Sequence, residues 1–323
     1  SAETIDFPLR AFYTTPTLQE SDAVRGSLKK DLTLVHSAMS YAEQTPDRFY
    51  SGYDTGWGCI INRLDARRRV TDDLLFRALL ENEAPLGPVF FLLQGPAGAG
   101  KTITLKRAAF DAATANQALV LWLNEGGKLR PEVFLEVSDL AKRPIYLFVD
   151  QAALHAEELF HFFGTMKARS VPLVVVAAER EADWSTYCGA LAETFPPNLL
   201  RVASLSSSEV ENLLDLLARH NCLGDLAKKS RDDQIAAFMS EEQADRQLLV
   251  ALHVLTKGLP FEQIVLDEYQ SVNPEQARRL YLDIATMNQF GVPVRAGTIS
   301  RVSGIDFREY KEKFFTPLKD IIS

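Results

Sequence analysis

Short, continuous runs of apolar residues recur through the middle of the chain, separated by longer stretches in which apolar and polar residues alternate with a helical period. The runs are Val89–Gln94, Ala118–Leu123, Ile145–Asp150, Pro172–Ala178 and Leu199–Ser204. The stretches between them predict helices near Lys101–Ala115, Glu132–Lys142, His155–Arg169 and Asp183–Glu193. Continuous Val, Leu, Ile and Phe runs are typical of strands buried on both faces, and their alternation with helices indicates a parallel α/β sheet.

The chain before the first run is less regular. Residues 1–30 are polar and predict irregular structure. Asp31–Gln44 predicts a helix, Arg48–Trp57 a packed loop, and Ile60–Asn82 a second helix. Aromatic residues in the loop (Phe49, Tyr50, Tyr53 and Trp57) either stack on a nucleotide base or only pack the segment onto the sheet. The run Arg67–Arg69 is interpreted as a solvated helix face.

After Ser204 the pattern predicts helices alone. A capping box at Ser206–Glu209 opens a helix to about His220. Further helices are predicted at Asp232–Met239, Glu242–Leu255 and Glu262–Tyr269, and then from Pro274 to Asn288, Arg295 to Val302 and onward from Asp306. The last three, with the turn Gly291-Val292-Pro293, resemble a winged-helix unit.

These patterns divide the chain into four predicted parts. They are an N-terminal segment (1–88) that packs on the nucleotide domain, a P-loop domain (89–205), a helical lid (206–272) and a winged-helix-like domain (273–323).

The first apolar run leads directly into a complete phosphate-binding motif. The sequence Gly95-Pro96-Ala97-Gly98-Ala99-Gly100-Lys101-Thr102 fits G-x-x-x-x-G-K-[ST] between a strand and a helix, and Ile103 follows it. Glycines let consecutive backbone N–H groups point at a phosphate. Lys101 is expected to reach the β- and γ-phosphates, and Thr102 to bind Mg²⁺. The motif predicts a site for a nucleoside triphosphate, ATP or its product ADP.

A second nucleotide motif is the apolar run that ends in Asp150. A carboxylate at this strand end lies beside the phosphate loop and can hold Mg²⁺ through water. P-loop ATPases often place a glutamate next, but this chain has Gln151, which does not accept a proton at neutral pH. Hydrolysis is therefore slow, or another acid acts as the base; Glu125 and Glu179, at two other strand ends, are the candidates. Glu179 equally fits a simple ion pair with Arg180.

Arg180 follows the fourth strand. In an additional-strand (ASCE) layout that strand lies between the phosphate-loop strand and the acid strand, so its end points at the γ-phosphate. An arginine there distinguishes a triphosphate from a diphosphate through a charge-assisted hydrogen bond. In the lid, Arg246 is a candidate second arginine for the nucleotide, and Gly258-Leu259-Pro260 a turn over the base.

The composition of the chain bears on which partners it can bind. The net charge of −8 argues against broad binding to DNA, and no apolar run is long enough to cross a membrane. Three widely spaced cysteines fit a reducing cytoplasm. The absence of an initiator Met indicates an excised segment.

With these motifs in place, residues from Arg48 to Ser323 resemble the STAND signal-transduction ATPases, which include NB-ARC proteins and bacterial antiphage NTPases. The resemblance rests on the phosphate loop, the acid strand, Arg180, the lid and the winged-helix-like unit. It implies a switch in which ADP holds the lid closed, while ATP and a trigger open it and drive self-association. It also implies flanking effector and sensor domains outside this sequence. Two features depart from the family: there is no Met-His-Asp near the C-terminus, and the arginine motif reads Ala-Glu-Arg instead of Thr-Thr-Arg.

Two alternatives use the same phosphate loop. A replication-initiator-like AAA+ ATPase would bind DNA through the winged helix, but the segment Arg295–Arg301 has only two arginines in an acidic chain. A small-molecule phosphotransferase does not need the lid or the winged-helix tail.

Overall fold

The computed structural model describes residues 8–15, 17–52, 55–240, 248–259, 261–272, 275–288 and 301. Its strands are β1 (Leu32–Leu34), β2 (Pro88–Gln94), β3 (Leu119–Leu123), β4 (Ile145–Val149), β5 (Leu173–Glu179) and β6 (Asn198–Arg201). The helices before the lid are α1 (Asp22–Lys30), α2 (Pro46–Tyr50), α3 (Trp57–Ile61), α4 (Arg69–Leu75), α5 (Lys101–Thr114), α6 (Pro131–Ala141), α7 (Ala156–Ala168), α8 (Glu181–Tyr187) and α9 (Gly189–Thr194). Those after β6 are α10 (Ser207–Arg219), α11 (Arg231–Met239), α13 (Leu248–Lys257), α14 (Phe261–Ser271) and α15 (Glu275–Asn288). Short 3-10 or π turns are η1 (Pro8–Phe12), η2 (Phe76–Leu80), η3 (Ala152–His155) and η4 (Gly224–Lys228).

Within the described residues, six strands form one sheet in the order β1-β3-β4-β5-β2-β6. All neighbours are parallel except β1, which runs antiparallel to β3. Strand β5 lies between β2 and β4, which confirms the additional-strand α/β layout predicted from the sequence. In register, Gln94 pairs with Glu179 and Val149 pairs with Ala177, so these three strands end side by side.

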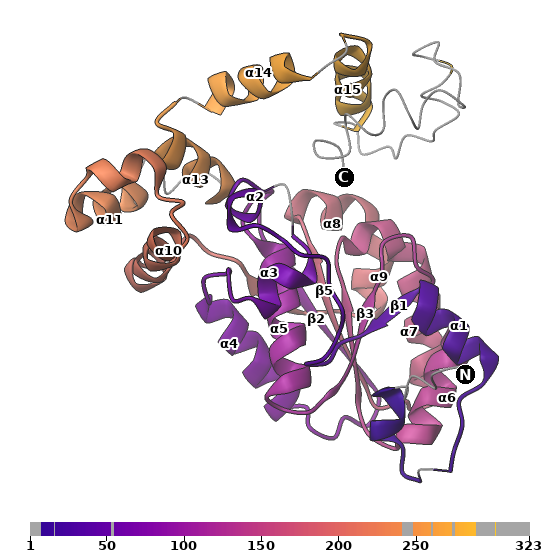
Figure 1. Cartoon of the computed structure of the whole chain (residues 1–323). Coiled ribbons are helices and arrows are strands. Elements are labelled where there is room, and N and C mark those ends of the chain that lie inside the picture. The colour runs from indigo at the N-terminus through magenta and orange to yellow at the C-terminus, as the bar shows by residue number, and fades with distance from the viewer. Residues whose placement is uncertain are drawn as a thin grey trace, which may run out of the picture.

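The sheet is buried on both faces because its central strands are apolar at consecutive positions. Phe90 and Leu92 of β2 point into one core, whereas Phe91 and Leu93 point into the other. Helices α6 and α7 cover the first face, and α4 and α5 cover the second (Figure 1). Each predicted strand and each predicted helix between strands is present, although Asp183–Glu193 is divided into α8 and α9.

The N-terminal predictions are wrong in four places. Arg48–Trp57 is not a loop throughout, because Arg48–Tyr50 belongs to α2 and Trp57 begins α3. Asp31–Gln44 is not a helix, because Leu32–Leu34 pairs with β3 at the edge of the sheet. Residues 1–30 are not all irregular: α1 begins after Ser21, whose side chain accepts a hydrogen bond from the N–H of Val24. The predicted helix Ile60–Asn82 is interrupted at residues 62–68, where Arg63 has a positive φ of 55°.

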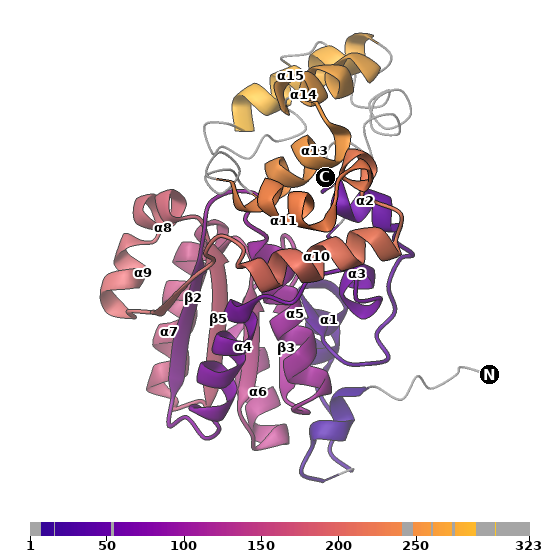
Figure 2. The ribbon, with the colours of Figure 1, turned by 90° about the vertical axis from the view of Figure 1, so that its left-hand side faces the viewer.

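A third apolar core joins the helices that follow β6, in the segment predicted as a lid. It contains Val210 and Leu214 of α10, Phe238 of α11 and Leu252 of α13, together with Tyr50 of α2. The predicted capping box is confirmed, because Ser206 and Glu209 bond reciprocally at the start of α10. Figures 1 and 2 place these helices beyond the carboxyl ends of the strands, next to α2.

Of the predicted winged-helix-like unit, the structure describes α15 and Arg301. The predicted helix from Pro274 to Asn288 corresponds to α15. The turn at residues 291–293 and the helix from residue 306 lie outside the described residues, and from the predicted helix 295–302 only Arg301 is described. In the described residues no helix is long and apolar enough to cross a membrane.

Candidate nucleotide site

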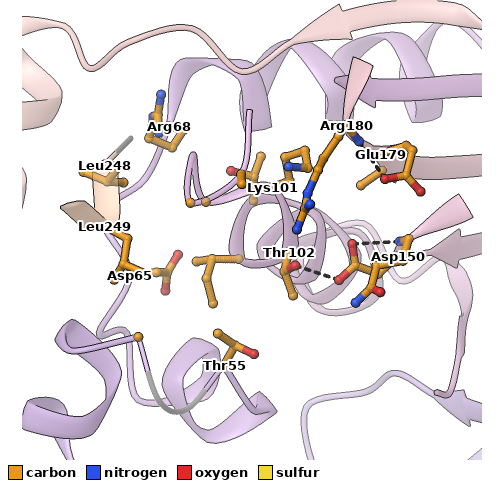
Figure 3. A pocket seen from close by; sticks show the side chains of 18 of the residues that line it. Thr55, Asp65, Arg68, Lys101, Thr102, Asp150, Glu179, Arg180, Leu248 and Leu249 are labelled. Atoms are coloured by element: carbon orange, nitrogen blue, oxygen red, sulfur yellow. Dashed lines mark hydrogen bonds between the residues drawn. The ribbon is translucent and has the colours of Figure 1, made fainter. Parts of the chain in front are cut away.

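A cavity of ≈ 770 Å³ lies at the carboxyl ends of the central strands (Figure 3). Its lining comes from the phosphate loop, the ends of β4 and β5, the N-terminal segment, the start of α10 and helix α13. The cavity brings together most of the residues predicted from sequence: Ala97, Gly98, Gly100, Lys101, Thr102, Ile103, Asp150 and Arg180. We call the part lined by these residues the phosphate end.

The phosphate loop has the backbone that its glycines allow. Gly98 and Gly100 have φ values of 67° and 85°, in the left-handed region that other residues rarely occupy. Gly100 is the N-cap of α5, so the first N–H groups of that helix face the cavity, where they favour an anion. The Lys101 Nζ donates to the carbonyl of Pro96 at 2.8 Å. Burial and, second, the positive charge of Arg180 lower the pKa of Lys101.

Three residues of the predicted motif belong to the loop without lining the cavity. They are Gly95, Pro96 and Ala99. The Pro96 carbonyl accepts the lysine, and the buried Ala99 has a carbonyl that accepts from Arg68 at 3.4 Å.

Thr102 and Asp150 meet as the two sequence motifs predict. The Thr102 Oγ1 donates to Asp150 Oδ2 at 2.6 Å, so a hydroxyl and a carboxylate share one point beside the phosphate loop (Figure 3). Oxygen ligands of this kind suit Mg²⁺, which usually keeps waters and phosphate oxygens as its other ligands. No group of three or more His, Cys, Asp or Glu side chains in the described residues could hold a metal by itself. The Thr102 hydroxyl and the Asp150 carboxylate fit an Mg²⁺ ion that also binds phosphate oxygens.

Two acidic residues were predicted as alternative bases, and only one of them, Glu179, lines the cavity. Glu125 is exposed and does not line the cavity. Glu179 lines it and is 5% exposed, and burial raises the pKa of this carboxyl. The Glu179 carboxylate already accepts backbone N–H groups from Ala153 at 2.8 Å and Arg180 at 2.7 Å. Gln151, which follows the acid strand, is exposed at the cavity rim.

Arg180 leaves the end of β5 and points into the phosphate end, towards Lys101 and Thr102 (Figure 3). Its only ion pair within the described residues is a long one, 3.8 Å from Nε to Asp183, and its side chain is 59% exposed. A weakly held guanidinium beside Lys101 leaves two positive groups in this part of the cavity, a suitable arrangement for a polyphosphate.

The other part of the cavity, which we call the base end, is mainly apolar. Its lining contains Phe49, Tyr50 and Gly52 from the N-terminal segment, Leu205 and Leu213 around the start of α10, and Leu248, Leu249 and Leu252 from α13. The backbone N–H of Leu249 donates to the carbonyl of Gly98 at 3.2 Å, so α13 touches the phosphate loop directly. Of the aromatic residues considered from sequence, Trp57 packs instead against Trp122 of the sheet, with ring centroids 5.2 Å apart.

The interpretation of Arg67–Arg69 as a solvated face is wrong for Arg68. Arg68 is 7% exposed, and its Nε lies 3.1 Å from Glu209 of the capping box. Its other nitrogens donate to the carbonyls of Ala99 and Ala203. One arginine thus joins the phosphate loop, the segment after β6 and the first turn of α10. Nothing in the sequence distinguishes it from its two neighbours.

The lid predictions are only partly within the described residues. Arg246 and Pro260 lie outside them. Gly258 follows the far end of α13 and packs against Asp225, and neither Gly258 nor Leu259 lines the cavity. The lid residues that do line it, Leu248, Leu249 and Leu252, were missed; their position at the start of an apolar helix after Arg246 is the available signal.

The sheet order, the loop between β2 and α5, and Asp150 on the strand beyond β5 define a P-loop NTPase of the additional-strand class. Residues 47–192 match the model of a family described as Novel STAND NTPase 5. This segment is less than half of the chain, and its similarity to the family agrees with the STAND resemblance predicted from the sequence.

Similar solved structures include the Hsp104:casein complex of S. cerevisiae (14% identity, 70% of this chain and 39% of that chain, TM-score 0.43). They also include Aeropyrum pernix Orc1 in complex with DNA (14% identity, 81% and 86%, TM-score 0.39) and Cdc6p of Pyrobaculum aerophilum (14% identity, 80% and 87%, TM-score 0.40). Similarities this distant carry no argument about function. A search of curated proteins gives no match.

Proposed function

We propose that this chain is an ATP- and ADP-binding switch whose lid responds to the nucleotide. The observation that carries the proposal is that one cavity is lined by the phosphate loop, by Arg180 and by α13 together. A ligand that fills this cavity touches the elements that bind phosphate and the element that can move.

The phosphate end supplies positive charge and hydrogen-bond donors for the polyphosphate. Backbone N–H groups of the loop and the start of α5 bind phosphate oxygens, and Lys101 contributes its ammonium. Thr102 and Asp150 would hold Mg²⁺, which neutralises phosphate charge when bound.

Arg180 distinguishes ATP from ADP in this proposal. Its guanidinium lies at the end of β5 beside Lys101, without a close ion pair in the described part of the chain. A γ-phosphate gives it a charge-assisted hydrogen bond that hydrolysis removes.

Hydrolysis is slow in this proposal. Gln151 can orient water but does not take up its proton at neutral pH. Both oxygens of Glu179 accept backbone N–H groups, and Glu125 stands outside the cavity. Bound ATP therefore persists long enough to act as a signal.

The base end couples nucleotide binding to the position of the lid helices. A nucleoside placed there contacts the N-terminal segment and α13 together, and these already share an apolar core through Tyr50 and Leu252. The bond from Leu249 N–H to Gly98 gives the lid a second contact, on the phosphate loop itself.

The finer parts of the proposal rest on the STAND resemblance. They are self-association when ATP opens the lid, a cytoplasmic antiphage or other signalling role, and effector and sensor domains that flank this segment. The acidic net charge of −8 supports a protein partner over DNA.

Isothermal titration with ATP and ADP tests the binding claim, with size-exclusion chromatography of each complex to test self-association. We expect both nucleotides to bind, Asp150→Ala to retain binding while losing its Mg²⁺ dependence, and ATP alone to increase the apparent mass. Binding of ATP by Lys101→Ala as tightly as by the unmodified chain would show that the site is assigned to the wrong residues.

A further inference from the structure

Glu179 connects two loops at the phosphate end. It is the last residue of β5 and is buried. One carboxylate oxygen accepts the backbone N–H of Arg180, in the loop after β5. The other accepts the backbone N–H of Ala153, in the 3-10 turn η3 that follows β4. A single side chain therefore fixes the backbone on both sides of the position that a terminal phosphate would reach.

The loop after β4 needs such a contact. Gln151 has a φ of 52°, a left-handed conformation that is unfavourable for a residue with a side chain. Asp150 Oδ1 accepts the Gln151 N–H at 3.1 Å, and the Gln151 carbonyl accepts the Leu154 N–H at 3.0 Å. Backbone of this kind persists only where its surroundings determine it.

A buried carboxylate is itself costly, so a role in packing alone does not explain it. An apolar residue of similar size would fill the same space without loss of hydration. What the carboxylate adds is two acceptor oxygens directed at two N–H groups, an arrangement that glutamine cannot reproduce because its NH₂ would face one of the donors.

We infer that Glu179 is a positioning residue that holds Arg180 and the loop of residues 150–154 in the geometry required to recognise a γ-phosphate. The inference rests on the proposed role of Arg180 and extends it to a residue that touches no phosphate. It also gives a physical reason for the sequence Ala-Glu-Arg at the end of β5: the residue before the arginine is the acceptor that sets its direction.

The test is a double-mutant cycle measured as ATP and ADP affinities in the presence of Mg²⁺. We expect Glu179→Gln to weaken ATP binding by about 10-fold, the usual effect of one lost charge-assisted hydrogen bond, and to leave ADP affinity within about 2-fold. Arg180→Ala should have at least the same effect, and the double variant should resemble Arg180→Ala alone because Glu179 acts through it. The matched control is Glu181→Gln, an exposed glutamate outside the cavity.

Three results would contradict the inference: an equal loss for ATP and ADP, no loss in Glu179→Gln, or additive effects in the double variant. If Arg180→Ala leaves the ratio of ATP to ADP affinity unchanged, the sensing role of Arg180 and the inference both fail. If only Glu179→Gln leaves it unchanged, the inference alone fails.

Hydrogen exchange of the unmodified protein tests the geometry even if Glu179→Gln does not fold. The amides of Ala153 and Arg180 should exchange much more slowly than that of the exposed Glu181. Exchange of all three at the same rate would overturn the inference.

Discussion

At the phosphate end of the cavity, the loop Gly95–Thr102, Asp150 and Arg180 each follow directly from a strand, and the three strands end side by side in the sheet. At the base end, the lining comes from α2, from α10 and the segment before it, and from α13. These elements are far apart in the sequence and meet through the apolar core that they share. The first region is positioned by a rigid sheet, whereas the second is positioned by contacts between separate helices.

Because of this difference, we expect that separate substitutions can weaken ligand binding at one end of the cavity without affecting the other end. Inorganic tripolyphosphate needs only the phosphate end, and ATP needs both. Comparing the two ligands therefore assigns the effect of any variant to one end or the other.

The largest expected effect falls on the residue that joins the two regions. Arg68→Met leaves the carboxylate of Glu209 buried without its guanidinium, and breaking a buried pair in this way typically costs about 3–5 kcal/mol. We expect a loss of about 3 kcal/mol in the free energy of unfolding, because Glu209 keeps the N–H groups of Ser206 and Arg69. Urea unfolding measures it. Arg69→Met, at the exposed neighbour, is the control. Equal losses of unfolding free energy in both variants would show that the contacts of Arg68 do not hold the two regions together.

Lys101→Ala removes a principal cation of the phosphate end. We expect ATP and tripolyphosphate affinities to fall together by about 100-fold or more, since a hydrogen bond between charged groups contributes up to about 3 kcal/mol. Competition titration measures both, with the exposed Lys29→Ala as control. A loss confined to ATP would place Lys101 at the wrong end.

Phe49→Ala removes apolar surface from the base end. Stacking or packing of a base on an aromatic ring contributes about 1–3 kcal/mol, so ATP affinity should fall by about 10-fold while tripolyphosphate affinity stays the same. Phe76→Ala, at a phenylalanine that is 53% exposed outside the cavity, should change neither. An unchanged ATP affinity in Phe49→Ala would mean that the base does not lie there.

The smallest expected effect is on the pH dependence of the phosphate end. Burial and the Arg180 charge lower the pKa of Lys101, and a bound polyanion restores the ammonium form. Binding therefore takes up a proton once pH exceeds the lowered pKa, and affinity for tripolyphosphate should fall by a few-fold between about pH 7 and about pH 10. Lys101→Arg, which stays charged, should flatten this dependence. A dependence equally steep in both proteins would exclude Lys101 as its source.

The phosphate end could be predicted from sequence because its chemistry is local. Lys101, Asp150 and Arg180 each lie shortly after the end of β2, β4 or β5. Because these three strands are parallel neighbours, their ends bring the three side chains to the same edge of the sheet. The base end could not be predicted from the sequence. Whether the Leu249 side chain faces the cavity depends on how α13 packs, and α13 packs on a core that it shares with α2. Arg68 shows the same limit: its burial follows from the position of Glu209, 141 residues later. Strand β1 was missed because its pairing with β3, and not local propensity, determines its backbone.

The most direct test of the switch is hydrogen exchange of α13 in the ADP and ATP complexes, both with Mg²⁺. We expect slow exchange across Leu248–Lys257 with ADP and faster exchange with ATP, because in the proposed switch ATP releases α13 from the phosphate loop. Identical exchange in the two complexes would mean that the lid does not respond to the nucleotide state, and the protein would then bind nucleotide without acting as a switch.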